Sequence, residues 1–299
     1  MAGTLTTTQA ACHVPEFWST KTRDAVEANV VAAGLVDQTF TAKLKGGPGD
    51  TMNIPYISNP TASTRTQNAN VTLEVIGPSA AEASQSFTVA THQIVAFAVE
   101  NITDVQAMTD MAGKYTKKGG YALGAAADTN LHTLPQNFSQ TVGTAGLEPT
   151  DDNYKRAAQY LDDALAPDDE RFIIMRPATW YSALSIDRFS STTYGSTAKA
   201  ENAIERAMVG TIYKFGVYKT TLVRAPSAGQ ADNWACHKLG VYYCSQQLKT
   251  NPPVWSPERD SDVVTMTHIY GYAEALQPPV TAGGGAATDV FNVLLSGTS

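Results

Sequence analysis

NITDVQAMTDMAGKYTKKGGYALGAAADTNLHTLP, residues 101–135, carries a helical pattern that ends at a proline. Its apolar side chains recur every three or four positions, which places them in one stripe along a helix. A helix of about 30 residues is about 45 Å long, because each residue adds about 1.5 Å. Gly119 and Gly120 lie inside the run, and each costs about 1 kcal/mol relative to alanine. The stretch therefore predicts one long helix with a bend or, alternatively, two helices separated at the glycine pair.

The composition of the whole chain limits the classes of function. The chain has 299 residues, enough for two domains or one elaborate domain. Charged residues make up 16%, below the usual quarter, so the surface is rich in uncharged polar groups or is largely covered by partners. The net charge of −7 disfavours a protein that grips nucleic acid, but it leaves open a container that surrounds nucleic acid.

The cysteines and the N-terminus indicate the compartment. An odd count of three cysteines (Cys12, Cys236 and Cys244) is no disulfide framework and fits a reducing compartment. The first residues lack the basic and apolar regions of a signal peptide. No apolar run reaches the 18 or so residues that span a bilayer. We therefore expect a soluble protein that was made and folded in a cytoplasm, with no membrane partner.

The first hundred residues predict a helix followed by strands. The pattern favours a helix over residues 19–33, stopped by Gly34. Between residues 45 and 101 the period changes to two, which predicts strands around residues 52–56, 71–75, 87–91 and 95–99. Residues 57–84 lack the apolar content for a core of their own. They predict a two-stranded excursion that needs a neighbour to lie on, because isolated ribbons are marginally stable. The alternative is an ordinary pair of edge strands in a sandwich.

The second half predicts a compact mixed domain. We expect a helix from Thr150 with Tyr154, Ala157, Leu161 and Leu165 on its apolar side, ended at residues 167–169. The remaining pattern predicts a buried strand at 172–175, a helix at 177–184, a flexible loop at 192–199, two strands around Gly216 within 209–226, and strands at 239–245 and 262–276. The tail, residues 281–299, is expected to be mobile unless a partner captures it.

Few residues have the spacing of a catalytic or metal site. Cys236, His237 and Cys244 are the only cluster of conceivable metal ligands, and they need a fourth ligand. The alternative is that all three lie on strands as core residues with buried thiols. The carboxylate pairs at 151–152, 162–163 and 168–169 fall at helix starts and turns, where aspartate is expected. The sequence thus predicts no catalytic, cofactor or metal site and no enzyme.

The aromatic residues of the second half predict packing positions. No basic residues are interleaved with them, as a base-stacking platform would require. We interpret them as anchors of the core and of interfaces, at Trp180, Tyr181, Trp234, Tyr242, Tyr243 and Trp255.

Three segments, in this order and downstream of the 101–135 helix, carry a resemblance to a known family. They are FIIMRPATWYSAL (172–184), VGTI (209–212) followed by Gly216 and Pro226, and IYGYAEALQP (269–278). They resemble the strand–proline–helix element, the next strand pair and the closing strand of the major capsid proteins of tailed bacteriophages, which have the Hong Kong 97-type fold. The resemblance covers residues 15–285.

The resemblance implies an α+β fold with named parts. It implies an N-terminal arm (1–35), an extended β-hairpin loop over a neighbouring subunit (36–100), a peripheral domain with a long spine helix (101–149 and 256–285), an axial domain (150–255) and a C-terminal tail (286–299). In a shell of variable curvature, the Gly119–Gly120 pair is a candidate hinge of the spine. Replacing both with alanine is then expected to leave the subunit folded but to disturb shell curvature or maturation.

The implied function is that of a coat protein. Copies would form the hexamers and pentamers of an icosahedral head that encloses double-stranded DNA, assembled in the bacterial cytoplasm and found in the virion. The chain has no lysine between Gly46 and Gly113, so the isopeptide cross-link of some members is not expected. The short arm indicates a separate scaffolding protein or none, beside a portal and a decoration or cement protein. The alternatives are an encapsulin-type nanocompartment shell and an enzyme that depends on Cys236 or His237.

Overall fold

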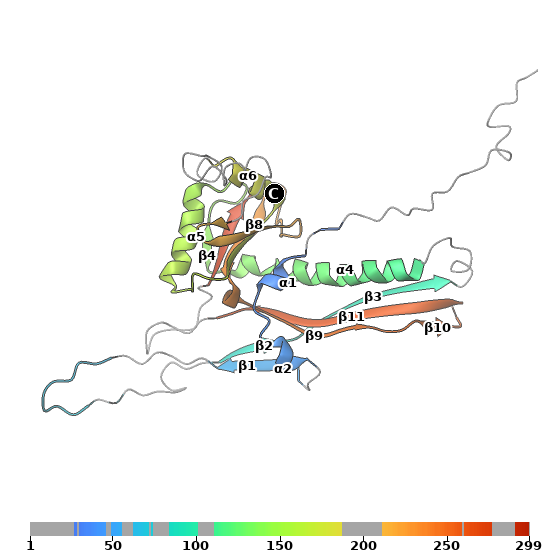
Figure 1. Cartoon of the computed structure of the whole chain (residues 1–299), viewed down its shortest axis with the longest axis horizontal. Helices are drawn as coiled ribbons and strands as arrows, with labels where there is room; N and C mark the ends of the chain where they lie inside the picture. The colour runs from blue at the N-terminus through green and yellow to red at the C-terminus, as the bar shows by residue number, and fades with distance from the viewer. Residues whose placement is uncertain are drawn as a thin grey trace, which may run out of the picture.

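The computed structural model describes the chain at residues 27–28, 30–45, 49–55, 62–71, 73, 84–100, 111–186, 211–258, 260–276 and 291–298. Figure 1 shows two parts of different shape. One is rounded and contains a six-stranded sheet, and the other is long and narrow, with helix α4 lying along a sheet. A two-stranded ribbon leaves the narrow part and leads away from the body.

Helix α4 (Met111–Leu131) runs without interruption through Gly119 and Gly120, so the two-helix alternative is wrong. Residues 101–110 of the predicted helix lie outside the described part of the chain. The helix also ends before the predicted Pro135, which lies in the 3-10 helix η2 (Leu134–Asn137). The last turn tightens, because the Thr133 amide donates to the Asn130 carbonyl three residues before it (3.1 Å), and the Thr133 hydroxyl donates to the same carbonyl (2.7 Å).

The two glycines of α4 have different surroundings. A Cβ on Gly119 would lie 2.2 Å from Met266 Cε and 3.3 Å from Val95 Cγ1, so this glycine lets the helix approach the sheet closely. A Cβ on Gly120 would meet nothing within 4 Å. The packing of α4 therefore explains Gly119, and the hinge stays a prediction.

The narrow sheet is built on the long strand β11 (Ser261–Glu274), which confirms the predicted strand at 262–276. It pairs antiparallel with β3 (Thr91–Glu100) on one side. On the other side it pairs with β9 (Val241–Thr250) and β10 (Val254–Ser256). Helix α4 covers one face, where the rings of Phe97 and Tyr115 lie 5.8 Å apart.

The base of the ribbon packs on the opposite face of the narrow sheet. Strands β1 (Thr51–Pro55) and β2 (Ser84–Thr88) pair antiparallel, as the two-stranded prediction requires. Phe87 is fully buried there in a cluster with Cys244 and with Leu44 of helix α2 (Thr41–Leu44). Gly271 of β11 allows this approach, because a Cβ there would lie 2.7 Å from the Thr88 carbonyl oxygen.

The six-stranded sheet has the order β4-β12-β8-β5-β7-β6. Its strands are β4 (Gln140–Val142), β5 (Arg171–Met175), β6 (Thr211–Ile212), β7 (Phe215–Lys219), β8 (Ala231–His237) and β12 (Asn292–Gly297). The predicted strand at 172–175 is confirmed, and its uninterrupted apolar run fits a strand buried on both faces.

Helices and the end of α4 cover the two faces of this sheet. One core contains Tyr154 and Leu161 of α5 (Asp151–Asp163) with Trp180 of α6 (Pro177–Leu184), which confirms both predicted helices. The other core joins Trp234 of β8 to Leu131 of α4. Leu165 was placed wrongly on the apolar side of α5, because the chain turns there with φ of 58° and leaves the side chain 69% exposed.

The predicted helix at 19–33 is wrong where it can be compared. Residues 27, 28, 30 and 31 are not helical, and helix α1 covers only Ala32–Leu35, with Gly34 inside it. The cause is tertiary, because side chains of α4 accept hydrogen bonds from the backbone amides of Ala28, Val31 and Ala33. The predicted strand at 71–75 is also wrong at Val71 and Leu73, which are 61% and 85% exposed and irregular.

Three strands of the rounded part contradict the prediction, and one turn lies elsewhere. Strand β4 lies within residues 136–150, which are predicted to be a polar linker. Strand β8 was missed, and β12 lies in the predicted mobile tail although it fills the position between β4 and β8. The turn expected at Gly216 is at Tyr213 and Lys214, both with positive φ (44° and 69°), as in a two-residue hairpin turn. The predicted strand at 239–245 begins later, at Val241, after the short 3-10 helix η3 (Lys238–Gly240). The loop predicted at 192–199 lies outside the described residues.

Candidate assembly surfaces

The cysteines and the histidine singled out in the sequence lie in two different cores. Cys236 packs with Trp234 in the rounded part, whereas Cys244 packs with Phe87 at the ribbon base. Burial raises the pKa of the Cys244 thiol, as expected for a core residue. His237 Nδ1 accepts a hydrogen bond from the Leu239 amide (3.1 Å). The interpretation of these residues as strand positions with buried thiols is confirmed, and no group of three potential metal ligands occurs in the described segments.

The aspartate pairs have structural partners. The side chain of Asp151, in the first turn of α5, accepts a hydrogen bond from Tyr213 (2.5 Å) and pairs with Lys155 (2.6 Å). The buried guanidinium of Arg171 donates to Asp162 (2.7 Å) and lies 3.3 Å from Asp168. It also donates to the carbonyls of Ala166 and Pro167. Asp162 and Asp168 thus stabilise the turn between α5 and β5 through Arg171.

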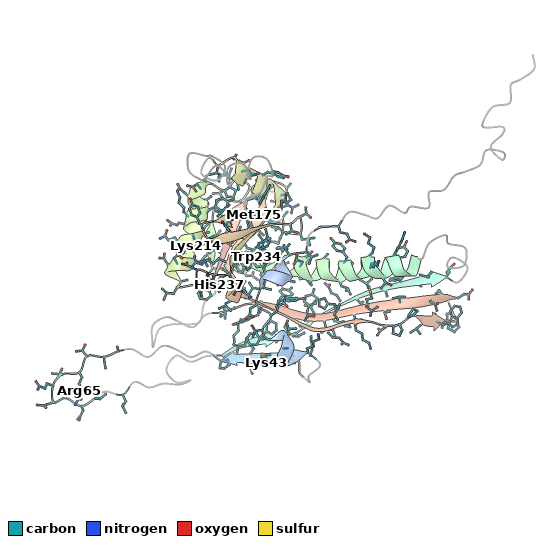
Figure 2. All side chains as sticks on the ribbon, viewed as in Figure 1. Lys43, Arg65, Met175, Lys214, Trp234 and His237 are labelled. Atoms are coloured by element: carbon teal, nitrogen blue, oxygen red, sulfur yellow. The ribbon has the colours of Figure 1, made fainter. Side chains whose placement is uncertain are left out.

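The aromatic residues divide into core and surface positions. Trp234, Trp180 and Tyr243 are buried, while Tyr181 is 56% and Trp255 45% exposed. Figure 2 shows Trp234 inside the rounded part. The prediction of core anchors is confirmed for the buried three. The exposed two remain candidates for interfaces, which nothing in a single chain tests.

The first candidate assembly surface is the ribbon tip, defined as residues 62–71 and 73. Every residue of it is exposed, including the large apolar side chains of Val71 and Leu73. Arg65 is its one charged residue and donates from Nε to the Ala69 carbonyl across a turn (3.2 Å). Figure 2 shows Arg65 far from the body. The tip thus offers apolar and polar groups, and one cation, to a partner.

The second surface is the open face, defined as the part of the narrow sheet opposite α4 and beyond the ribbon base. Directly paired residues share a face, so it consists of Ile94 with Thr267, Ala96 with Thr265, and Ala98 with Val263. Ile94 is 60% exposed, and Ala96 and Ala98 are exposed as well. These six are apolar or weakly polar, and the exposed Lys249 of β9, which pairs with Thr267 on the other side of β11, adds one cation to the face.

The open face continues into a cavity at the far end of the sheet. This end cavity has a volume of about 660 Å³ and is lined by residues that include Val254, Trp255, Pro257, Glu258, Val263 and Thr265. Four exposed carboxylates stand at this end of the sheet, those of Glu100, Glu258, Asp260 and Asp262. The ribbon tip lies at one end of the molecule, and strand β10, which lines the end cavity, lies at the other end (Figure 1).

Sequence reasoning found the ribbon but missed the open face. The alternation of Val95, Phe97 and Val99 predicts a strand, but it does not indicate that the residues between them form a second apolar face. The usable signal was that Ile94, Ala96 and Ala98 put apolar groups on the second face as well, where a solvated strand carries polar ones.

Comparisons with known proteins identify the fold. No family model and no curated protein sequence matches the chain. A solved structure from Mycobacterium phage Che8 matches 94% of this chain and 96% of its own, with a TM-score of 0.77 at 17% identity. The capsid structure of the Cyanophage P-SCSP1u matches 94% and 92%, with a TM-score of 0.70 at 10% identity. The asymmetric unit of the bacteriophage PhiM1 mature capsid covers the same shares, with a TM-score of 0.66 at 12% identity.

These matches extend over almost the whole of each chain and include the narrow sheet, the ribbon and the rounded part. The chain therefore has the α+β capsid fold of tailed bacteriophages that its sequence resembles.

No helix in the described segments is long and apolar enough to cross a membrane.

Proposed function

We propose that the chain is the major capsid protein of a tailed bacteriophage. Copies of it assemble into the hexamers and pentamers of an icosahedral head that encloses double-stranded DNA, and the protein resides in the virion. The observation that carries this proposal is a capsid fold that exposes a ribbon tip at one end of the molecule and an open sheet face that leads to the other end.

The contact between subunits follows from these two surfaces. The ribbon tip of one copy lies over the narrow sheet of its neighbour, where the apolar groups around Ile94 and Val254 are exposed. Arg65 then approaches the end of the sheet that carries the four carboxylates, a charge complementarity that favours correct docking. Because the two surfaces differ, the contact is heterologous, and repeated head-to-tail contacts close into rings.

The parts of the subunit take the roles that the resemblance implies, with shifted bounds. We assign the rounded part, including β4 and β12, to the axial domain at the capsomer centre. Helix α4 with β3, β9, β10 and β11 forms the peripheral domain. The extended loop then covers residues 36–90, because β3 belongs to the narrow sheet.

The partners follow from the chemistry of the chain. No lysine stands between Gly46 and Gly113, so shell strength comes from non-covalent overlap or a separate decoration protein. A separate scaffolding protein and a portal complete the head. The net charge of −7 suits enclosure of DNA without sequence-specific binding, and the chain acts as a structural protein rather than an enzyme.

Electron microscopy of the purified, full-length protein tests this function. We expect icosahedral particles or capsomer rings, and we expect Arg65→Glu combined with Ile94→Asp to reduce them while the circular dichroism spectrum is unchanged. The same charge reversal at the exposed Arg156 of α5, Arg156→Glu, is the matched control. A monomer at every concentration and salt condition would sink the proposal. Particles that enclose a cargo enzyme instead of DNA would favour the nanocompartment shell.

A further inference from the structure

The segment that joins the N-terminal arm to the body lies on helix α4. The amide of Ala28 donates to the Tyr121 hydroxyl (2.8 Å), and Glu27 pairs with Lys118 (2.6 Å). Farther along, the amides of Val31 and Ala33 donate to the two carboxylate oxygens of Asp128 (3.2 and 3.0 Å). We call the described residues 27–28 and 30–33 the strap.

The geometry of the strap matches that of the helix. The ten-residue step from Lys118 to Asp128 spans about 15 Å of helix, and six residues of chain reach at most about 20 Å, so the strap is long enough to follow this step. Lys118, Tyr121 and Asp128 fall within about 80° around the helix axis, since each residue turns about 100°. One stripe of α4, beside its sheet-facing stripe, therefore holds the strap along its length.

The three fastenings differ in burial. Lys118 and Glu27 are 35% and 37% exposed, so their ion pair is weak. Asp128 is fully buried, and it caps helix α1, whose own N-cap residue Val31 supplies no side-chain hydrogen bond. Two hydrogen bonds from amides to a buried carboxylate are the strongest of the set. The strap is thus held firmly at Asp128 and loosely at its outer end.

Asp128 also connects the strap to the rounded part of the molecule. His132 Nδ1 accepts a hydrogen bond from Trp234 Nε1 (3.0 Å), which places the proton of a neutral imidazole on Nε2. That nitrogen lies 3.5 Å from Asp128 Oδ2 without a hydrogen bond to it, so the two fully buried side chains are in electrostatic contact only. The carboxylate therefore stands between the strap and β8.

We propose that Asp128 is a latch for the N-terminal arm and that the strap is releasable. The strap opens from its outer end, at Glu27, while Asp128 holds Val31 and Ala33. When the latch opens, the whole strap leaves α4 and withdraws Ala32 and the half-buried Val31 and Ala33 from the core beside Leu131. The helix and both sheets persist, because their own hydrogen bonds do not involve the strap. The arm can then change direction without unfolding of the subunit.

Amide hydrogen exchange of the unaltered full-length protein is the first test. We expect the amide of Ala28 to exchange faster than those of Val31 and Ala33, and all three to exchange faster than those of β5. Equal exchange across the strap and β5 would overturn the proposal, because the strap would then be part of the core. Val31 and Ala33 exchanging as fast as the ribbon tip would also overturn it, because the latch would not hold.

Variants separate the latch from a general packing role. Asp128→Asn replaces one acceptor oxygen with a donor, and we expect roughly tenfold or faster exchange at Val31 and Ala33 with unchanged protection in β5 and β11. Tyr121→Phe should speed exchange at Ala28 alone, and the exposed Asp152→Asn is the control. Loss of protection in β5 and β11 together with the strap, or no change at Val31 and Ala33, would overturn the latch. If Asp128→Asn does not fold, the exchange order of the unaltered protein and Tyr121→Phe still decide.

Discussion

The six-stranded sheet and the narrow sheet bury their strands differently. Every residue of β5 and of β8 is buried, because cores lie on both faces of the six-stranded sheet. In β3 of the narrow sheet, half-buried and exposed residues alternate, because only α4 covers that length. The six-stranded sheet is covered on both faces by its own chain, whereas the narrow sheet leaves the open face and the end cavity accessible to a partner. A charged content of 16% fits a molecule with this second kind of surface.

The largest expected effect is on the rounded part, from deletion of residues 291–299. This removes β12, whose side chains Val293 and Leu295 are fully buried and whose backbone pairs with both β4 and β8. The two side chains alone contribute roughly 3–6 kcal/mol, a large share of the stability of an ordinary domain. Circular dichroism and thermal unfolding should show loss of the cooperative transition. A truncated chain that unfolds like the full one would contradict the central position of β12.

A matched pair of alanine substitutions compares the two sheets directly. Leu295→Ala, in the buried sheet, should lower the free energy of unfolding by about 2–5 kcal/mol. Ile94→Ala, on the open face, should change it by no more than about 0.5 kcal/mol in the unassembled chain. Chemical denaturation below the assembly concentration measures both. Equal losses would mean that the open face is covered within the chain itself.

A smaller effect is expected where the ribbon meets the narrow sheet. Gly271→Ala would bring a Cβ within 2.7 Å of the Thr88 carbonyl oxygen and 2.9 Å of Val89 Cα, so backbone must move, at a cost of about 1–3 kcal/mol. Gly120→Ala is the control and should stabilise α4 by about 0.5–1 kcal/mol, because its Cβ meets nothing within 4 Å. Thermal unfolding reports both changes, and a neutral Gly271→Ala would show that the ribbon base is not seated on β11.

The smallest expected effect is on the acid limb of stability, to which each part contributes a histidine. Burial lowers the pKa of His268 in the narrow sheet and of His237 in the rounded part below the ordinary value of 6.5. The unfolded chain therefore binds these protons more readily, and their contribution is present above pH 6.5 and lost as the pH falls through the folded pKa.

Thermal unfolding from about pH 7.5 to 5 measures this loss. His268→Gln should flatten the acid limb, and the exposed His92→Gln should leave it as it is. An unchanged slope in His268→Gln would assign the acid sensitivity to other groups.

Most elements of the fold could be predicted where one local pattern dominates. The apolar run of β5, the proline start of α6, the stripe of α5 and the long alternation of β11 are each visible in the sequence. Strand β8 was not visible, because it buries Asp232 and Asn233, and only the tertiary structure supplies their partners. Arg224 pairs with Asp232 (2.6 Å), and Asn233 bonds with Thr179 and with the amide of Arg176.

The candidate surfaces could be predicted in kind but not in place. Low charge and an unsupported ribbon indicated large interfaces. The paired strands of the ribbon lie at residues 51–55 and 84–88, at the edges of the predicted excursion, and the described residues between them are irregular. The strap could not be predicted, because the amides of Ala28, Val31 and Ala33 donate to side chains of α4 about 95 positions away. A local sequence pattern does not indicate such a contact. The open face was missed because it depends on which strand lies opposite β3.

The place of β12 in its sheet also orders events during synthesis. The ribosome makes β4, β5, β7 and β8 before β12, so the nascent chain has an unfilled slot between β4 and β8. Strand β12 pairs slowly with β4, because the two strands are about 150 residues apart and the chain between them must first be ordered. Until then, the edge of β8 is open to strands of other molecules. A chaperone that shields this slot, or a concentration low enough to avoid such encounters, should therefore raise the yield of correctly folded subunits.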